Sequence, residues 1–274
     1  MPEGPEIRLA ADRIAEVLVG ERIAEVSFAF PKLRRYEREL SGATVTAVDT
    51  RGKAMLTRFD NGLTLYSHNQ LYGRWYTAKR GQSPDTARSL RVALHTETHS
   101  ALLYSASDVD VLGAKELERH PFLRRAGPDI LDESLTANAV AERLHEPRFH
   151  RRSLGALYLD QSFLAGIGNY LRSEILYTSG LHPALRPVDL DKPSLKKLAR
   201  ETLKISRRSY KTRGVTVPRE HARRLKAKGM EYGQYRFWVF GRDGSPCYAC
   251  GRKIERMAVN SRGLFYCPSC QPLE

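Results

Sequence analysis

All four cysteines of this 274-residue chain lie near its C-terminus, as Cys247, Cys250, Cys267 and Cys270. They form two Cys-x2-Cys pairs separated by 16 residues. This spacing is typical of a site in which two tight turns bring four thiolates tetrahedrally around one zinc ion. Two disulfides are the alternative, which a cytosolic compartment disfavours. We therefore predict one structural Zn²⁺ in a β-hairpin finger whose tip lies around Asn260, Ser261 and Arg262.

Positive charge is concentrated in one stretch of the chain. The formal net charge is +14 at pH 7, and residues 186–236 alone hold 16 Lys and Arg against 5 Asp and Glu. A generally basic, soluble surface would spread this charge, whereas a phosphate-binding face requires such a concentration. The charge therefore indicates a nucleic-acid partner, without distinguishing DNA from RNA.

Membrane insertion and secretion find no support in the sequence. No apolar run reaches the roughly 18 residues that a membrane-spanning helix needs. The acidic start Met-Pro-Glu-Gly-Pro-Glu has no apolar leader segment. We expect a cytoplasmic protein, without a membrane partner.

The predicted elements change in character along the chain. An amphipathic helix is expected over residues 5–18, followed by strands at 21–30, 44–50, 53–59, 63–67, 91–95 and 101–105. Residues 120–128 are turn-rich, as in a linker. Helical periodicity follows at 135–144, 154–159, 170–177 and 194–210. The order predicts an antiparallel β domain, a helical domain and a small metal module.

The second residue is a proline, Pro2, which becomes a free secondary amine once Met1 is removed. An α-amine has a pKa of about 8, against about 10.4 for a lysine side chain, so far more of it is neutral and nucleophilic near neutral pH. The N-terminus of the expected helix disfavours a nearby cation and increases this fraction. Condensation with an aldehyde-like carbon gives an iminium, and Glu3 is suitably placed to shuttle protons. Many proteins simply begin Met-Pro, and Glu3 and Glu6 could merely favour the start of a helix.

Three separated motifs resemble one family, in its order and over nearly the whole chain. They are residues 2–7 (Pro-Glu-Gly-Pro-Glu-Ile), a Gly-Ile-Gly-Asn turn at residues 166–169, and the four-cysteine finger. Together they resemble the formamidopyrimidine-DNA glycosylase/endonuclease VIII (Fpg/Nei) family. Gly4 and residues 66–72 (Tyr-Ser-His-Asn-Gln-Leu-Tyr) are more similar to its bacterial endonuclease VIII branch.

The resemblance implies an α+β multidomain fold. An N-terminal antiparallel β-sandwich with an opening helix would fill residues 1–124 and be followed by a linker at 125–132. A helical domain with a helix-two-turn-helix motif would span 133–236, and the zinc finger 237–271. The implied partner is double-stranded DNA with a damaged base or an abasic site, bound by a monomer at the bacterial nucleoid.

The resemblance also implies roles for individual residues. Pro2 would attack C1′ of the damaged nucleotide, and Glu3 would act as general acid and base. Lys53 would serve β-elimination, and Arg262 would hold the phosphate beside the lesion and assist δ-elimination. Two further sets are implied: Gln70, Leu71 and Tyr72 would fill the gap left by the extruded nucleotide, while Arg125 and Asn169 would bind phosphates.

Each of these residues also has an ordinary interpretation when it is taken alone. Lys53 and Arg262 could be solvated surface side chains, and residues 70–72 could pack at a strand end. The Gly166–Asn169 turn could simply join two helices, although its N–H groups are also suited to facing a phosphate. One departure from the family is the basic stretch at residues 215–234, which is longer than expected.

The leading hypothesis is a bifunctional DNA glycosylase and abasic-site lyase of base excision repair. It would remove oxidised pyrimidines, such as thymine glycol or dihydrouracil, and cut the strand by β,δ-elimination. One alternative keeps the chemistry and changes the lesion to 8-oxoguanine and formamidopyrimidines. The other is a non-catalytic protein that binds damaged DNA.

Overall fold

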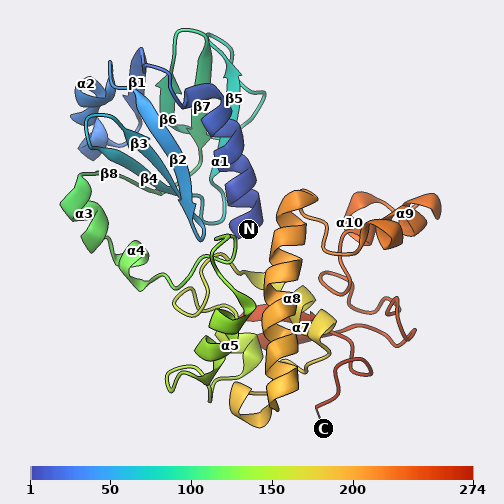
Figure 1. Cartoon of the computed structure of the whole chain (residues 1–274). Coiled ribbons are helices and arrows are strands. Elements are labelled where there is room, and N and C mark those ends of the chain that lie inside the picture. Colours follow the sequence, from blue (N-terminus) through green and yellow to red (C-terminus); the bar gives the residue numbers. More distant parts are fainter. Residues whose placement is uncertain (1, 274) are drawn as a thin grey trace. The chain divides into compact units, whose positions relative to one another are not determined.

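The computed structural model describes residues 2–273, which divide into two compact units (Figure 1). Unit 1 contains Pro2 and Glu6–Arg125, and unit 2 contains Glu3–Pro5 and residues 126–273. The chain therefore passes from one unit to the other at its very beginning and again after Arg125. Helix α1 (Gly4–Leu18) begins in unit 2 and continues into unit 1.

Unit 1 is a sandwich of two four-stranded antiparallel sheets. Helix α1 packs its apolar stripe against the sandwich core, as the helical spacing predicts. The first sheet contains, in order, β1 (Glu25–Phe28), β6 (Leu90–His95), β7 (His99–Tyr104) and β5 (Arg74–Lys79). The second contains β2 (Val45–Arg51), β3 (Ala54–Phe59), β4 (Thr64–His68) and β8 (Asp108–Leu112).

The predicted hairpins of unit 1 are confirmed. Asp60, Asn61 and Gly62 join β3 to β4, and Gly62 has a φ of +81°, a left-handed conformation that glycine adopts without steric cost. Strands β6 and β7 form the second hairpin. The expected strand over residues 21–30 is shorter in the structure, because only Glu25–Phe28 pair with β6. Strands β5 and β8 were not predicted.

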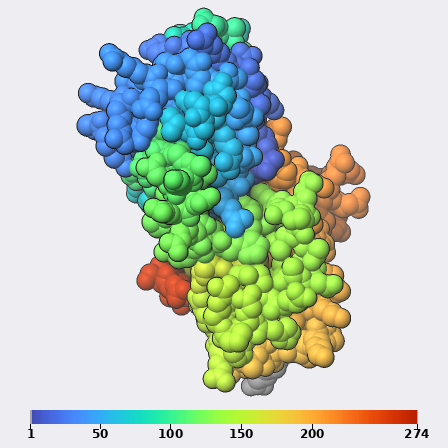
Figure 2. All heavy atoms as spheres, turned by 60° about the vertical axis from the view of Figure 1, so that its left-hand side comes forward, coloured from blue at the N-terminus to red at the C-terminus, as the bar shows by residue number. Residues whose placement is uncertain are grey.

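Short helices that the sequence did not predict cover parts of unit 1. These are η1 (Pro31–Leu33), α2 (Tyr36–Leu40), α3 (Ala114–Arg119) and α4 (Pro121–Arg125). Helices α3 and α4 place Leu117, Phe122 and Leu123 over the outer face of the second sheet. In Figure 2 their green atoms lie against the blue atoms of the strands. Because α4 falls within residues 120–128, this part of the expected linker is helical and packed.

Unit 2 has a helical core around α7 (Asn169–Ser179) and α8 (Lys192–Lys211), which lie side by side (Figure 1). Both helices were predicted, and Gly180, with a φ of +73°, ends α7. The remaining elements are α5 (Ala137–His145), α6 (Leu154–Leu157), η2 (Pro187–Asp189), α9 (Arg219–Ala227), α10 (Tyr232–Tyr235), β9 (Glu255–Val259) and β10 (Arg262–Tyr266).

The finger is an antiparallel hairpin of β9 and β10, whose turn is Asn260-Ser261. Both turn residues have φ above +50°, as the tight two-residue turn of a hairpin requires. The finger packs on α7, where the Phe265 N–H donates to the Ser173 hydroxyl at 3.3 Å. The predicted position of the finger tip is confirmed.

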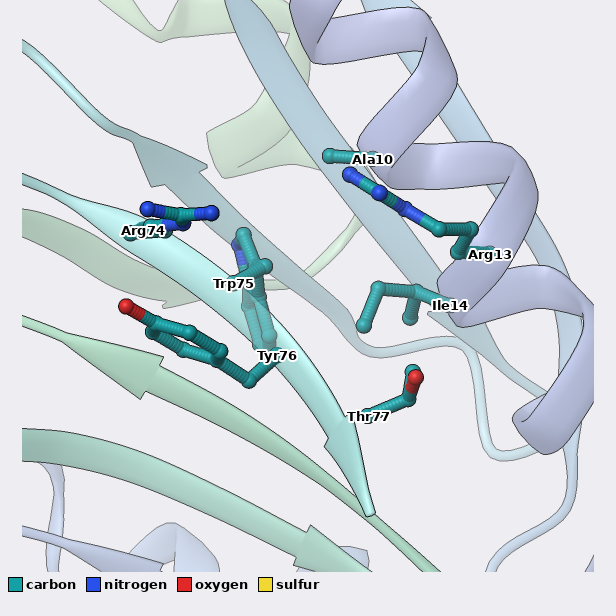
Figure 3. Close-up of a pocket in the computed structure, with 7 residues that line it drawn as sticks. All are labelled: Ala10, Arg13, Ile14, Arg74, Trp75, Tyr76 and Thr77. Carbon is teal, nitrogen blue, oxygen red and sulfur yellow. The ribbon is translucent and has the colours of Figure 1, made fainter. Parts of the chain in front are cut away.

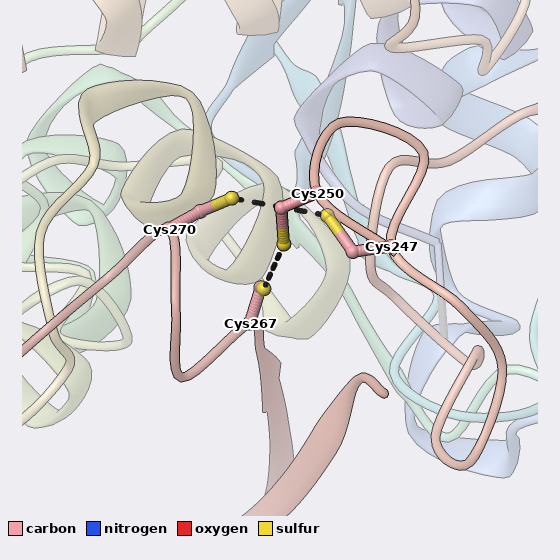
Figure 4. A group of neighbouring side chains, drawn as sticks. All are labelled: Cys247, Cys250, Cys267 and Cys270. Carbon is pink, nitrogen blue, oxygen red and sulfur yellow. Dashed lines mark hydrogen bonds between the residues drawn. The ribbon is translucent and has the colours of Figure 1, made fainter. Parts of the chain in front are cut away.

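The sulfur atoms of Cys247, Cys250, Cys267 and Cys270 converge on one point (Figure 4). All four lie within 4.8 Å of one another, with 3.9 Å between Cys247 and Cys270 and 3.5 Å between Cys250 and Cys267. Four sulfurs about 2.3 Å from a tetrahedral zinc ion are separated by about 3.8 Å. The cysteines are free thiols, so the disulfide alternative is excluded and the geometry fits one structural zinc ion.

No helix within residues 2–273 combines the length and the apolar character that spanning a bilayer demands.

Removal of zinc is predicted to unfold the finger. Cys267 is fully buried, so Cys267→Ser should lower the zinc content from one ion per chain to nearly none and lower the unfolding temperature of unit 2. Metal analysis and calorimetry measure both quantities. Ser269→Ala, an exposed position in the same turn, is the control and should retain the metal. A fully stable Cys267→Ser chain without zinc would contradict a structural role for the metal.

Candidate active site

The carboxylate of Glu3 lies at the N-terminus of α7. Its oxygens accept hydrogen bonds from the backbone N–H groups of Gly168 (2.7 Å), Tyr170 (2.7 Å) and Leu171 (3.2 Å). These are N–H groups that a helix leaves without partners in its first turn, where the helix dipole also favours an anion. Glu3 is only 3% exposed. Removing a carboxylate from water costs several kcal/mol, which three charge-assisted hydrogen bonds of about 1.5–3 kcal/mol each offset.

The glycines before α7 allow the chain start to approach this closely. A Cβ atom on Gly168 would lie 2.4 Å from Cδ of Glu3. Gly4 donates its N–H to the Gly166 carbonyl at 2.8 Å, and a Cβ on Gly4 would lie 3.1 Å from Cα of Gly166. The Gly166–Asn169 turn was expected to present its N–H groups to a DNA phosphate. In the structure the N–H of Gly168 and those of the first turn of α7 bind Glu3 instead, which corrects that expectation.

Asn169 connects the start of α7 to the finger. Its Nδ2 donates to the carbonyl of Gly263 in β10 at 2.7 Å. Its Oδ1 accepts from both Nε and Nη2 of Arg172, at 3.1 and 2.7 Å. Arg172 also donates to the carbonyl of Gly155 at 2.7 Å and to that of Arg262 at 3.4 Å. The exposed side chain of Arg262 therefore belongs to a strand that Asn169 and Arg172 hold in place.

Arg172 is fully buried, which sequence reasoning did not anticipate. The pKa of Arg172 is lowered to about 10, mainly by burial and also by the positive charge of Arg262, whereas the negative charge of Glu3 acts to raise it. The guanidinium remains charged at neutral pH. Unit 2 thus gathers Glu3, Asn169, Arg172 and the backbone of Arg262 around one helix end.

In unit 1, Lys53 lies in the turn between β2 and β3, after Gly52 with its φ of +61°. Its side chain is only 7% exposed, so it is not the solvated lysine of the ordinary interpretation. Buried lysines are rare unless they are paired or functional. Pro2, half-buried in unit 1, precedes Glu3 by one peptide bond.

The turn at residues 69–73 presents two large apolar side chains to solvent. Leu71 is 53% exposed and Tyr72 is 66% exposed. The turn is tight, because the Gly73 N–H donates to the Asn69 carbonyl at 2.7 Å, and a Cβ on Gly73 would lie 2.6 Å from that oxygen. Arg88 donates to the Tyr72 carbonyl from outside the turn. The turn is therefore preorganised with its apolar side chains exposed, and the strand-end packing of the ordinary interpretation does not occur.

Gln70 is held in a left-handed conformation, with a φ of +47°. Its N–H donates to Nδ1 of His68 at 3.1 Å, and its side-chain amide donates to Asp108 at 3.4 Å. Burial lowers the pKa of His68, Asp108 raises it and Lys53 lowers it, so that Nδ1 stays available as an acceptor. His68 and Asp108 thus position Gln70, a role that nothing in the residue pattern indicated.

Arg125, the last residue of α4, is exposed in unit 1. A cavity of about 170 Å³ lies elsewhere in this unit, between α1 and β5 (Figure 3). It is lined by Arg13, Arg74 and Tyr76 among others, and the guanidinium of Arg74 lies 5.0 Å from the ring centre of Tyr76. The lining contains no carboxylate, histidine, lysine or cysteine, and none of the site residues predicted from the sequence.

Three family models match separate parts of the sequence. The formamidopyrimidine-DNA glycosylase N-terminal domain matches residues 1–108. The formamidopyrimidine-DNA glycosylase H2TH domain matches residues 126–220. The zinc finger found in FPG and IleRS matches residues 244–273. The matches follow the sandwich, the helical region and the finger in order.

Relatives named Endonuclease 8 match over the full length. Those of Escherichia coli (strain K12 / DH10B) and Shigella sonnei (strain Ss046) are 50% identical over 271 residues, covering 99% of this chain and 100% of the relatives. Among solved structures, MutM in complex with DNA containing carbocyclic 8-oxo-G has a TM-score of 0.81 at 20% identity and covers 99% of this chain and 100% of that one.

A second solved structure is the complex of Lactococcus lactis Fpg with DNA containing an abasic site. It has a TM-score of 0.80 at 19% identity and covers 98% of this chain and 99% of that one. At identities of 19–20%, the two solved structures show only that the fold is shared. The full-length identity of 50% to the Endonuclease 8 relatives shows membership of the same family. The chain belongs to the formamidopyrimidine-DNA glycosylase/endonuclease VIII family.

Proposed function

We propose that the chain excises oxidised pyrimidines from double-stranded DNA and cuts the strand through a Schiff base at Pro2. Its family membership, with Endonuclease 8 relatives 50% identical over the full length, makes it a bifunctional DNA glycosylase and abasic-site lyase.

The observation that carries the proposal is the buried carboxylate of Glu3, fixed by three N–H donors next to the residue that supplies the amine. A carboxylate fixed one peptide bond from Pro2 is a preorganised proton acceptor and donor, which general acid–base catalysis requires. An ordinary acidic helix start would leave Glu3 in solvent. Its burial therefore favours the catalytic interpretation over the ordinary one.

The chemistry begins with the neutral amine of Pro2. Its lone pair attacks C1′ of the damaged nucleotide, the bond between C1′ and the base breaks, and the base departs with the proton that the amine loses. Glu3 then donates a proton to O4′ as the C1′–O4′ bond breaks, and the opened sugar is an iminium between Pro2 and C1′, which withdraws electrons from the neighbouring carbon. Loss of a C2′ proton expels the 3′ phosphate, and a second elimination expels the 5′ phosphate. Both ends of the one-nucleotide gap then carry phosphates.

Lys53 and Arg262 serve these eliminations in the proposal. A buried lysine such as Lys53 can hold or accept a proton near the reacting sugar. Arg262 offers a planar fork of donors for phosphate oxygens, on a strand that Asn169 and Arg172 fix. Asn169 and the exposed Arg125 contribute further phosphate contacts.

Gln70, Leu71 and Tyr72 form the wedge that replaces the extruded nucleotide. Attack at C1′ requires the nucleotide to leave the base stack, at a cost of a few kcal/mol. Burial of a large apolar side chain contributes about 1.5–3 kcal/mol, so insertion of Leu71 and Tyr72 offsets this cost. Their exposure in the preorganised turn supports this role.

The protein in this proposal acts as a monomer on nucleoid DNA in the bacterial cytoplasm. Solved homologues bind DNA that contains an abasic site or an oxidised pyrimidine, which supports damaged DNA as the substrate. The full-length similarity to Endonuclease 8 relatives supports oxidised pyrimidines over 8-oxoguanine.

Blocking the amine of Pro2 is predicted to abolish covalent trapping. A chain with a cleavable extension ahead of Pro2 has an amide nitrogen there, so borohydride should trap no adduct with abasic DNA. Cleavage that leaves Pro2 as the first residue should restore trapping in the same preparation.

Full trapping by the extended chain would refute the nucleophile assignment. Met1 lies outside the described residues, and intact-mass spectrometry of the untagged protein is expected to show that it has been removed. Abasic DNA that is bound but never cut would favour the non-catalytic binder.

Gly168→Ala is predicted to inactivate the enzyme without unfolding it. The added Cβ must displace the Glu3 carboxylate, and a misplacement of about 1 Å costs roughly 100-fold in rate. Single-turnover base excision measures the loss. Gly233→Ala is the matched control, because a Cβ there meets nothing within 4 Å. An active Gly168→Ala enzyme would show that the position of Glu3 does not matter.

Lesion preference is tested with matched duplexes. The value of kcat/KM for thymine glycol should exceed that for 8-oxoguanine by about tenfold or more, a difference that a few polar contacts provide. The reverse order would favour the alternative lesion class while leaving the chemistry intact.

A further inference from the structure

Helix α9 lies in a part of the chain that the family models leave mostly unmatched. The family models end at residue 220 and resume at residue 244, so most of α9 (Arg219–Ala227) is uncovered. The sequence indicated only that residues 215–234 are long and basic. In the structure this stretch folds into two short helices of unit 2 (Figure 1).

The inner face of α9 packs on a small apolar cluster. Ala222 and Leu225 are buried against Val217 and Tyr235. Lys226 places its ammonium 4.8 Å from the ring centre of Tyr235. The helix is therefore a docked element with one buried and one exposed face.

Aromatic rings attach α9 to the zinc finger. The ring centre of His221 lies 4.5 Å from that of Trp238 and 5.1 Å from that of Tyr248. Tyr248 directly follows the zinc ligand Cys247, and the guanidinium of Arg242 lies 3.4 Å from its ring centre. The folded finger is thus part of the platform that positions α9.

The same platform reaches the helix end that binds Glu3. The N–H groups of Trp238, Val239 and Phe240 donate to the buried carboxylate of Glu174 in α7, at 2.8, 2.9 and 3.0 Å. One residue earlier, the ring of Phe237 packs on Tyr170, with 5.1 Å between ring centres. Since the Tyr170 N–H binds Glu3, packed residues of unit 2 connect α9 to the helix end that binds Glu3.

Helix α9 carries several exposed cations and one exposed acidic residue, Glu220, in its first turn. Within residues 2–273, none of its exposed basic side chains forms an ion pair with a carboxylate. Arg219 stands in the first turn, where the helix dipole disfavours a cation, and it repels Arg223 one turn later. These two charges lower the stability of the helix in the free protein, and an anion bound between them would reduce their mutual repulsion. The exposed cations of the outer face are Arg219, Arg223 and Arg224, and Lys228 follows directly after the helix.

We propose that the outer face of α9 is a second DNA-binding surface, which contacts backbone phosphates apart from the lesion itself. The inference rests on the proposed function, because it takes damaged duplex DNA as the substrate. A continuous polyanion suits a row of cations on a docked helix, since each contact releases counterions without reordering the protein.

The test measures the salt dependence of binding by the zinc-loaded enzyme. The probe is a duplex with a tetrahydrofuran abasic analogue, which cannot be cleaved through a Schiff base. In Arg219→Gln/Arg223→Gln, the slope of log K against log salt should become shallower by about two, with a Kd increase of roughly tenfold or more near 0.15 M salt. Glutamine preserves helix propensity, so the docked helix should persist.

Two matched variants separate position from total charge. Arg219→Lys/Arg223→Lys keeps both charges and should keep the wild-type slope. Lys196→Gln/Arg200→Gln removes two exposed charges at the same spacing on α8 and should leave the slope nearly unchanged. Equal losses in the α8 and α9 variants would overturn the proposal, because total charge would then account for the effect.

The outcomes distinguish this inference from the proposed function. If the wild-type enzyme neither binds nor cleaves abasic duplexes, the proposed function fails. If it does both and the α9 glutamine variant has the wild-type slope, only the inference about α9 fails. A shallower slope confined to the α9 glutamine variant supports both.

Discussion

The carboxylate of Glu3 at the N-terminus of α7 is the interaction on which the candidate site depends. A free carboxylate beside a flexible chain start would have no defined position. Three backbone donors, together with the dipole of an 11-residue helix, define it. The arrangement requires an absent side chain at Gly168. A turn that the sequence assigned to DNA phosphates therefore fixes the carboxylate that we propose as the general acid and base.

The buried guanidinium of Arg172 extends this organisation to the finger. Asn169 contacts the finger strand directly, and Arg172 fixes Asn169 while also reaching the carbonyl of Arg262. The zinc ion supplies the complementary constraint, because it closes the base of a hairpin too small to have a sufficient core of its own. Two constraints therefore position Arg262: the metal fixes the base of the hairpin, and Asn169 and Arg172 of α7 bind the backbone of the strand that carries it.

Much of the fold could be predicted because periodicity and turn chemistry act locally. The hairpin at Asp60–Gly62, the long helix α8 and the cysteine finger all followed from such patterns. Tertiary context determined the rest. Strand β5 carries bulky side chains on both faces and gives a weak alternation, and α9 has few apolar positions. The burial of Arg172 and Glu174 depends on partners that are distant along the chain, and a single sequence does not show which distant residues come into contact.

Several residues to which we assign a function depart from the burial or backbone conformation that is usual for their residue type. Lys53 is buried, Gln70 adopts a left-handed backbone, and Leu71 and Tyr72 are exposed. Arg219 stands at the wrong end of a helix dipole. The exposed apolar side chains and the cation at a helix N-terminus cost stability in the free protein, and in our proposal DNA relieves both: a base stack covers the apolar wedge and a phosphate binds the cation. Residues that violate local structural preferences are concentrated at functional sites in folded proteins. Because one ligand, damaged duplex DNA, would interact favourably with such residues in both units, they support DNA as the ligand of both.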